Sequence, residues 1–398
     1  MSRATANVHP SATRSASNRL AASIAGIALF LLAVGPATPA LASADRLTEQ
    51  PRRPIDGGIL FLAQAARDVR FAQMERFYTG HEIPAGQHAR PLTRGRHLSL
   101  DARAVASFIR SAHATGLIVL QAGRVRLERY AEGAGPHTRW TSFSVTKSVT
   151  SILAGAAIRD GYIRSVDDPA TDYLPQLRGG GYDGVTIAQL LTMTSGVRWN
   201  EDYSDPLSDV VGLYGYRPPA GEDRTVAYMR RLPRAARPGE RWAYNTGETD
   251  LVGALVQGAT GRPLATYLAQ TIWRPYGMAR QAYWLTDAQG RDAGGSGLSM
   301  TLRDMARLGQ LALEGGDGIV PAGWFATATR PTSIIDARGD GYGYLWWTYR
   351  RGRFAARGIF GQSILVDPAS RTVIAMAADW HAPPTRRSRR SATASKRP

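Results

Sequence analysis

Ser144-Val-Thr-Lys147 lies near the start of a stretch, residues 141–160, that the sequence predicts to be a helix. The apolar residues there recur at helical spacing: Val145, Val149, Ile152, Leu153 and Ala156. A step of three residues places Ser144 and Lys147 on one face of that helix. Unpaired N–H groups and the positive dipole end at the helix N-terminus favour an anion and help to keep a lysine neutral. We therefore expect Ser144 to be a nucleophile and Lys147 its base.

The use of basic residues singles out the same lysine. The chain has 398 residues, and its 49 basic side chains comprise 47 arginines and two lysines. Lys396 stands in the C-terminal tail, so Lys147 is the only lysine in the body of the protein. Arginine stays protonated in proteins, whereas a buried lysine can lose its proton. A site that needs a neutral amine cannot replace lysine by arginine, which makes this exception informative.

Strand patterns lie towards both ends of the body, and helical patterns fall between them. The strand-like stretches are residues 116–123, 125–130, 343–350, 361–366 and 372–378. The helical stretches are residues 141–160, 186–192, 249–260 and 297–314. We expect an α/β (α+β) fold in which a mainly antiparallel sheet, built from both ends of the chain, is flanked by helices. A mostly helical insertion spans about 161–280, and the active site lies in the cleft between the two parts.

The part of the chain before this domain has no clear pattern. Residues 43–96 are rich in Arg, Gly and Pro and show weak periodicity. We expect them to lie on the surface as an N-terminal lead-in to a domain that spans residues 97–380.

The first 42 residues resemble an export signal. Arg3, Arg14 and Arg19 precede an apolar run at 20–34, and Ala40-Leu-Ala42 is a small-x-small cleavage pattern. We predict cleavage after Ala42 and a periplasmic or secreted protein. The alternative is an uncleaved membrane anchor, but the run is short for a spanning helix. The absence of cysteine suits an oxidising compartment and excludes a lipoprotein anchor.

The formal net charge of +17 does not by itself indicate nucleic-acid binding. The first 42 and the last seventeen residues carry nine of these charges without any acidic residue. The basic tail, residues 381–398, has few apolar side chains to bury and is predicted to be disordered. We expect this tail to make no more than weak contact with anionic surfaces. No nucleic-acid motif accompanies it, so we expect no nucleic-acid partner.

Two further motifs supply groups that the proposed chemistry needs. In Trp242-Ala-Tyr244-Asn-Thr246, a tyrosine beside cations can pass a proton to a leaving group. In Ala356-Arg-Gly-Ile-Phe-Gly-Gln362, glycines let the backbone approach a ligand, and the N–H groups of Ile359 and Ser144 could form an oxyanion hole. Taken singly, the tyrosine motif would equally suit an aromatic residue packed in the core, and the glycine motif would equally suit a strand bulge.

The ordered set Ser-x-x-Lys, Tyr-x-(Asn/Ser/Thr) and a glycine-bearing strand resembles the serine β-lactamase and penicillin-binding-protein superfamily. The chain is most similar to its class C-like branch, which includes DD-peptidases, esterases and 6-aminohexanoate-dimer hydrolase. The resemblance covers residues 97 to 380, and three linking segments support it: 186–196, 297–304 and 342–347. It implies a β-lactamase/transpeptidase-like fold and a covalent acyl-enzyme, with no metal or organic cofactor.

Residues 200–206 and 358–362 resemble the 6-aminohexanoate-dimer hydrolase group in particular. That resemblance implies that Tyr203 lines the acyl side of the cleft and that Ile359 gives the second oxyanion amide. The motifs also contain further substrate-binding candidates: Asn245, Arg357, Gly358 and Gln362. The chain departs from the lactamases at the third motif, where Arg357 stands near their lysine or histidine. It departs from the dimer hydrolase at Gly294-Gly295, where that enzyme has a polar substrate-binding residue.

Other hydrolase classes fit the sequence poorly. It has no Gly-x-Ser-x-Gly elbow, and its seven histidines lie before residue 138 or at position 381, away from the strongest motifs. The histidines also form no pair with metal-ligand spacing, which argues against a zinc hydrolase.

The sequence thus predicts an exported serine hydrolase that cleaves an ester, amide or peptide bond of a small molecule. Ser144 attacks, Lys147 is the base, and Tyr244 is the proton donor. The alternatives are a penicillin-binding DD-peptidase, a β-lactamase, or a sensor that kept the fold and lost catalysis.

Overall fold

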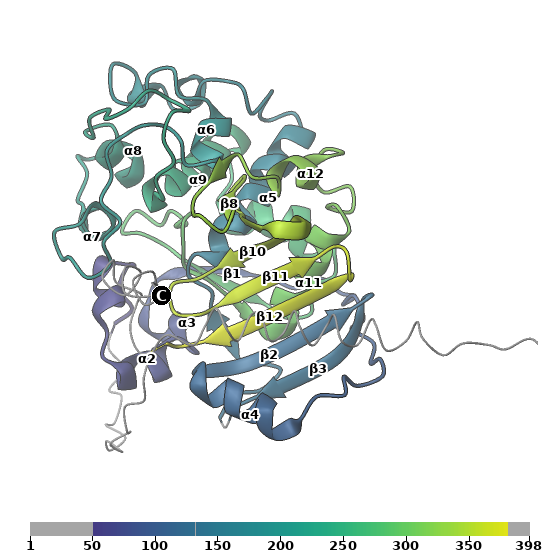
Figure 1. Cartoon of the computed structure of the whole chain (residues 1–398). Coiled ribbons are helices and arrows are strands. Elements are labelled where there is room, and N and C mark those ends of the chain that lie inside the picture. The colour runs from purple at the N-terminus through teal and green to yellow at the C-terminus, as the bar shows by residue number, and fades with distance from the viewer. Residues whose placement is uncertain (1–50, 132, 381–398) are drawn as a thin grey trace, which may run out of the picture.

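Residues 51–131 and 133–380 are described by a computed structural model, shown in Figure 1. Its main sheet has eight antiparallel strands in the order β3-β2-β12-β11-β10-β9-β8-β7. The early strand β2 pairs with the last strand, β12, so both ends of the domain meet inside the sheet. The expected mixed α/β fold with an antiparallel sheet and flanking helices is confirmed.

The bounds of these strands are β2 Ala114–Gln121, β3 Arg124–Tyr130, β7 Ser333–Ile334, β8 Gly341–Tyr342, β9 Trp347–Tyr349, β10 Arg353–Arg357, β11 Ser363–Asp367 and β12 Thr372–Ala378. A second antiparallel sheet, which the sequence did not reveal, has the order β1-β5-β6-β4. Its strands are β1 Gly80–Ile83, β4 Arg139–Thr141, β5 Ala282–Leu285 and β6 Leu298–Thr301.

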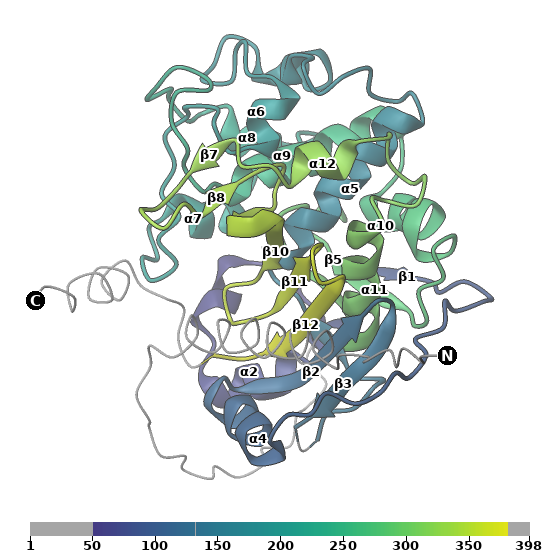
Figure 2. The same ribbon diagram turned by 45° about the vertical axis from the view of Figure 1, so that its right-hand side comes forward.

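Side chains that alternate along β2 pack on opposite faces of the main sheet. Leu117 and Val119 belong to a small apolar cluster beneath α4 (Ala102–Ser111). Ile118 and Leu120 belong to the large core on the other face, where α11 (Leu302–Leu313) lies against β2, β11 and β12. Figures 1 and 2 show α4 and α11 on either side of the sheet. The sheet is therefore covered on both faces.

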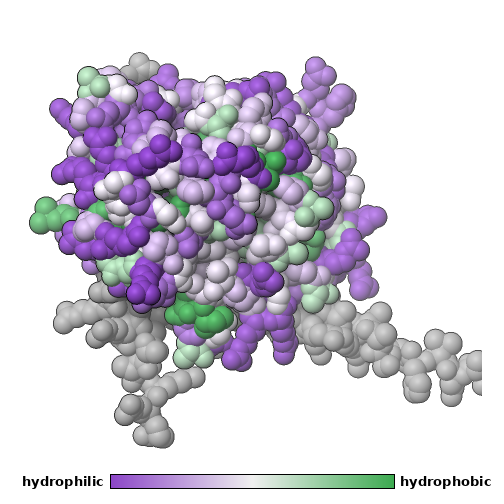
Figure 3. Space-filling view, turned by 90° about the horizontal axis from the view of Figure 1, so that it is seen from above, coloured by the Kyte–Doolittle hydropathy of each residue, from purple (hydrophilic) through white to green (hydrophobic). Residues whose placement is uncertain are grey.

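The helical part of the chain stands above one end of the sheet (Figure 2). Its centre is the pair α5 (Val145–Arg159) and α9 (Thr246–Thr260), which pack against each other. Shorter helices surround them: α6 Ile187–Leu191, α7 Asp209–Gly215, α8 Arg224–Met229, α10 Leu264–Leu268 and α12 Trp324–Ala328. Seen from above, the molecule is mainly hydrophilic with separate hydrophobic spots (Figure 3).

The segment before residue 97 differs from our expectation, because it is not confined to the surface. It forms η1 (Gly57–Phe61), α2 (Gln64–Arg70), α3 (Met74–Phe77) and strand β1. Buried apolar side chains anchor it in the large core, namely Ile55, Ile59, Phe71, Met74, Tyr78 and Ile83.

Two predicted helices also begin later than expected. The helix predicted at 141–160 begins at Val145, because Arg139–Thr141 is strand β4. Residues 297–314 were predicted to be helical throughout, but 298–301 form strand β6, and α11 starts after Thr301. The Thr301 side chain accepts a hydrogen bond from the backbone N–H of Asp304, so it caps the helix.

The predicted signal segment and the basic tail lie outside the described residues. Within the described ranges, no helix is both long enough and apolar enough to cross a membrane.

Candidate active site

The turn between β4 and α5 places Ser144 at the helix N-terminus. Phe143 has a φ of 46°, which is rare for a residue with a side chain. Its ring packs 4.9 Å from the ring of Phe71 and 4.9 Å from that of Phe360. Such surroundings can hold a strained backbone in place. The same aromatic cluster thereby connects the residue before Ser144 with the residue after Ile359.

Lys147 lies one turn into α5 and is buried, with 1% of its surface exposed. Its Nζ lies 3.1 Å from Ser144 Oγ and donates a 2.7 Å hydrogen bond to the backbone carbonyl of Gly295. Burial lowers the pKa of Lys147 to about 8, although the negative charges of Glu201 and Asp250 act in the opposite direction. At neutral pH the Lys147 amine is therefore deprotonated in part of the protein molecules.

The carbonyl that binds Lys147 is itself fixed in position. The N–H of Gly295 donates a 2.7 Å hydrogen bond to Asp250 Oδ1, on α9. A Cβ at Gly294 would come within 2.9 Å of the Thr249 carbonyl oxygen, so glycine permits this close approach of the loop to α9. Gly294-Gly295, where the chain departs from the dimer hydrolase, is buried here and orients the lysine.

Tyr244 lies just before the N-terminus of α9, on another side of Lys147. The Lys147 Nζ is 5.4 Å from the centre of the tyrosine ring. That ring stacks on Trp347 at a centroid distance of 5.6 Å, and Trp242 and Tyr342 pack against it edge-on. The second sequence motif therefore converges on the same lysine as the first.

Ile359 lies in the short loop between β10 and β11 and lines the same pocket as Ser144. Gly358 N–H donates to the Gln362 carbonyl at 2.7 Å, and Phe360 N–H donates to Gln362 Oε1 at 3.2 Å. Between these two, the N–H of Ile359 has no acceptor among residues 51–131 and 133–380. The same holds for the N–H of Ser144 across that part of the chain, so both can serve a ligand.

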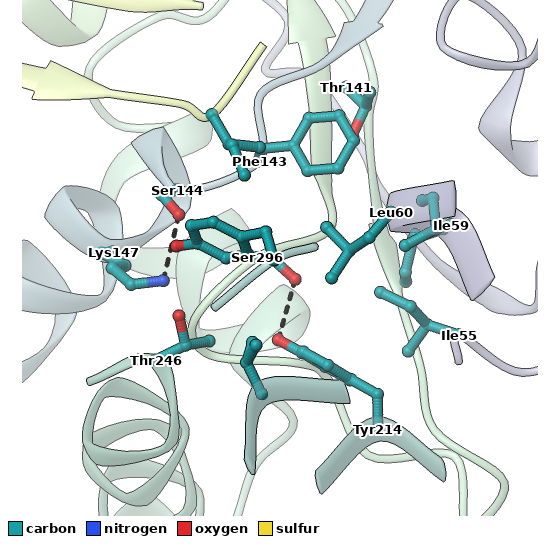
Figure 4. Close-up of a pocket in the computed structure, with 15 residues that line it drawn as sticks. Ile55, Ile59, Leu60, Thr141, Phe143, Ser144, Lys147, Tyr214, Thr246 and Ser296 are labelled. Carbon is teal, nitrogen blue, oxygen red and sulfur yellow. Dashed lines mark hydrogen bonds between the residues drawn. The ribbon is translucent and has the colours of Figure 1, made fainter. Parts of the chain in front are cut away.

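A pocket opens in front of Ser144 and Lys147 (Figure 4). The lining residues come from the N-terminal segment, the second sheet, several helices and loops that include the one between β10 and β11: Ile55, Ile59, Leu60, Thr141, Phe143, Ser144, Lys147, Tyr203, Val210, Tyr214, Thr246, Leu285, Ser296, Gly297 and Ile359. Tyr203 thus lies at the pocket, as its motif implied.

The four other candidates for substrate binding do not line this pocket. Asn245 is buried and caps α9, because its Oδ1 accepts from the N–H of Glu248 at 3.0 Å. Gln362 is buried and its Nε2 donates to the Ala378 carbonyl at 2.9 Å, so it holds the Ile359 loop. The Arg357 guanidinium lies over the Trp347 ring, 5.5 Å from its centre. Gly358 acts through its backbone, since a Cβ there would come within 2.7 Å of the Ser142 carbonyl oxygen.

Glu201 is a site residue that sequence reasoning missed. Its carboxylate accepts hydrogen bonds from Tyr203 OH at 2.7 Å and from Thr246 N–H at 2.9 Å. The Thr246 hydroxyl and the Trp199 indole N–H also donate to it. Glu201 therefore ties the Tyr203 loop to the N-terminus of α9. Its place beside Tyr203 in Asn200-Glu-Asp-Tyr203 was the available signal.

Metal ligation has no support in the described part of the chain. There, no group of three or more His, Cys, Asp or Glu side chains is arranged to hold a metal ion.

Comparison with known proteins identifies the family. The Beta-lactamase family model matches residues 102–396. A 6-aminohexanoate-dimer hydrolase of Paenarthrobacter ureafaciens is 31% identical over 289 residues, which cover 68% of this chain and 73% of that protein.

Solved structures show the same fold at low identity. A penicillin-binding protein from Bacillus halodurans superposes with a TM-score of 0.57 at 17% identity, over 73% of this chain and 98% of that one. A D-stereospecific amidohydrolase from Streptomyces gives a TM-score of 0.55 at 21% identity, over 71% and 95% of the two chains. The chain belongs to the Beta-lactamase family of serine hydrolases and has its β-lactamase/transpeptidase-like fold.

Proposed function

We propose that this protein hydrolyses an ester or amide bond through an acyl-enzyme on Ser144. One observation carries the proposal: a buried lysine whose pKa is lowered to about 8 has its amine 3.1 Å from the Ser144 hydroxyl. A neutral lysine amine has two hydrogens and one lone pair. If one hydrogen binds the Gly295 carbonyl, the lone pair can accept the Ser144 proton.

Acylation begins when Ser144 Oγ attacks the substrate carbonyl carbon and its proton passes to Lys147 Nζ. The carbonyl oxygen becomes negative in the tetrahedral intermediate. The free N–H groups of Ser144 and Ile359 stabilise that oxyanion. The positive dipole end of α5 adds to this stabilisation.

Collapse of the intermediate breaks the bond to the leaving oxygen or nitrogen. Tyr244 delivers a proton to that atom, and the proton held by Lys147 restores the tyrosine. Water then attacks the acyl-enzyme, and its proton passes through the Tyr244 hydroxyl to the neutral amine of Lys147. The carboxylic acid departs and Ser144 regains its hydrogen.

The decisive experiment measures release of nitrophenol from a short-chain nitrophenyl ester. The wild-type protein should turn over, and Ser144→Ala should abolish the release. Ser148→Ala is a matched control, because it also removes a serine hydroxyl from this helix. The Ser148 hydroxyl donates to the Leu345 carbonyl, and Ser148 does not line the pocket. A fluorophosphonate should add one label to the wild-type protein and none to Ser144→Ala.

Equal rates for wild type and Ser144→Ala would rule out the serine mechanism. A penicillin that stays bound to Ser144 without turnover would favour the sensor. Rapid hydrolysis of penicillin or of a D-alanyl-D-alanine peptide would instead favour the lactamase or DD-peptidase.

We also propose that the protein is exported with cleavage after Ala42. The charged start, the apolar run and the small-x-small site support this proposal. Expression of the full chain in a bacterium, followed by mass measurement of the periplasmic and membrane fractions, tests it. A product that retains residues 1–42 in the membrane would favour the anchor.

A further inference from the structure

The wall of the pocket that faces the nucleophile comes from the N-terminal segment. Ile55, Ile59 and Leu60 lie across the pocket from Ser144 and Lys147 in Figure 4. These three residues precede the range that the family model matches, which begins at residue 102. The wall thus comes from the lead-in segment, outside the matched range.

Several contacts hold this wall in place. The N–H of Ile55 donates to the Thr286 carbonyl at 3.0 Å, and the Asp56 carboxylate caps η1 through the N–H of Gly58 at 2.9 Å. A Cβ on Gly57 would come within 3.2 Å of the Val211 Cα, so glycine lets η1 pack directly on α7. Ile55 and Ile59 are 3% and 5% exposed. The wall is therefore built into the fold.

The chemistry of the lining is apolar and nearly uncharged. Val210, Leu285 and Phe143 complete the apolar surface. Lys147 is the only charged side chain among the lining residues of this pocket. Asp202 and Asp205, which flank Tyr203 in sequence, do not line the pocket, and each accepts a backbone N–H of its own loop. A charged substituent would lose its hydration there without gaining a partner.

Polar side chains interrupt this surface, but the hydroxyls of Tyr203 and Thr246 donate to Glu201. The Tyr214 hydroxyl and Ser296 Oγ are 3.0 Å apart and hydrogen-bonded, as Figure 4 shows. Because each hydroxyl already has a partner, this pair tolerates an apolar neighbour and can offer a hydrogen bond to an uncharged acceptor.

The two sides of the scissile bond can be told apart. Tyr244, the proposed proton donor to the leaving group, is not among the lining residues, whereas Ser144 and Ile359 are. The leaving group therefore lies on the side of Tyr244 and Trp347. The group that remains on Ser144 fills the pocket.

We propose that the N-terminal segment and α7 form an acyl-binding subsite that selects an uncharged, apolar acyl group. This inference rests on the proposed function, because it names the substrate class for the same Ser144 chemistry. Ile59 and Leu60 are the specificity-determining residues, and neither touches the reacting atoms.

A series of nitrophenyl esters tests the subsite in the purified wild-type protein. We expect kcat/KM to rise from acetate to butyrate and hexanoate, by about tenfold or more across the series. The 6-aminohexanoate ester and the adipate monoester, which place a charge at the end of the chain, should be at least about tenfold poorer than hexanoate. A matching series in which only the alcohol varies should show a weaker dependence.

Variants of the wall should change this profile without removing catalysis. Ile59→Ala and Leu60→Ala should lower kcat/KM for hexanoate by about tenfold, and that for acetate by less than about threefold. Phe61→Ala is the matched control, because Phe61 is 46% exposed and does not line the pocket. Leu60→Asp, at a half-buried position, should raise the preference for the 6-aminohexanoate ester over hexanoate. Thermal unfolding of each variant shows that it is folded.

The outcomes separate the two proposals. If the acetate ester is hydrolysed in a Ser144-dependent way but chain length and terminal charge have no effect, the subsite is wrong and the proposed function stands. If kcat/KM depends on the length of the alcohol rather than on that of the acyl group, the pocket holds the leaving group and the acyl-binding subsite is likewise overturned. If the wild-type protein hydrolyses neither these esters nor the corresponding nitroanilides, the proposed function itself fails.

Discussion

Lys147 Nζ donates a 2.7 Å hydrogen bond to the backbone carbonyl oxygen of Gly295. This contact fixes the direction of the amine, and the same nitrogen lies 3.1 Å from Ser144 Oγ. Because the carbonyl can accept a hydrogen from either protonation state, the geometry persists when the lysine is neutral. The base is thereby oriented before a substrate binds.

The pKa of Lys147 can be measured directly, because the chain has only one other lysine. In protein labelled with 13C-lysine and carrying Lys396→Arg, a single lysine resonance should titrate with a midpoint near the pKa of about 8. Since the neutral amine is the active form, kcat/KM should rise about tenfold per pH unit below this midpoint and level off above it. A midpoint near 10.5, the ordinary value, would contradict the assignment.

Replacing Lys147 by arginine should remove most of the activity while keeping the charge. Arginine does not lose its proton in proteins, so it cannot accept the Ser144 proton. We expect kcat/KM to fall at least about a hundredfold in Lys147→Arg. Lys396→Arg makes the same chemical change in the tail and should retain full activity. Substantial activity in Lys147→Arg would disprove the role of this lysine as the base.

Asp250→Asn should shift the pH dependence towards lower pH. The Asp250 charge raises the pKa of Lys147, and asparagine can still accept the Gly295 N–H while carrying no charge. The pKa of Lys147 should therefore fall, and kcat/KM at pH 6 to 7 should increase. The lysine resonance and the rate profile should move together. Glu240→Gln, at an exposed carboxylate, should change neither the lysine resonance nor the rate profile. An upward shift of the Lys147 pKa in Asp250→Asn would contradict the electrostatic argument.

The local parts of this site could be predicted from sequence. Ser144 and Lys147 are one helical turn apart, so a single periodic stretch brought them together. Tyr244 and Ile359 were found because each stands in a short motif whose backbone context is also local. The strand patterns at 116–123, 125–130, 361–366 and 372–378 likewise predicted the centre of the main sheet.

The parts that depend on distant contacts could not be predicted in the same way. The strands of the second sheet have three or four residues each, too few to show a period, and β6 runs directly into the helical pattern of α11. The pocket wall was missed because Ile55 and Ile59 stand in a segment without periodicity. Only the contact of that segment with α7 and residue 286 reveals its role.

Tyr244→Phe should affect poor leaving groups far more than good ones. Nitrophenolate departs without a proton, whereas ethoxide needs one, so only the second requires the tyrosine hydroxyl. We expect kcat/KM for ethyl butyrate to fall about a hundredfold or more, and that for nitrophenyl butyrate by less than about tenfold. Tyr342→Phe, whose ring lies 6.1 Å from that of Tyr244, is the matched control and should change both rates equally. Equal losses for both esters in Tyr244→Phe would assign the tyrosine a packing role.

Glu248→Gln should make the protein more stable at alkaline pH. Glu248 is buried on α9, and burial raises its pKa to about 8, although Ser195 and Asn245 donate hydrogen bonds to it. The folded state therefore holds a proton that the unfolded chain, with a carboxyl pKa near 4.5, releases. Between these two pKa values the unfolded state binds fewer protons, so stability falls as the pH rises.

Glutamine resembles the protonated acid but has no charge to bury. The melting temperature of Glu248→Gln should be close to that of wild type at pH 5 and higher by about 2 °C or more at pH 8.5. Glu240→Gln, which is exposed, should leave the difference between the two pH values unchanged. If Glu248→Gln is equally destabilised at both pH values, the ionised carboxylate stabilises the fold. That result would contradict the argument that burial raises the pKa of Glu248.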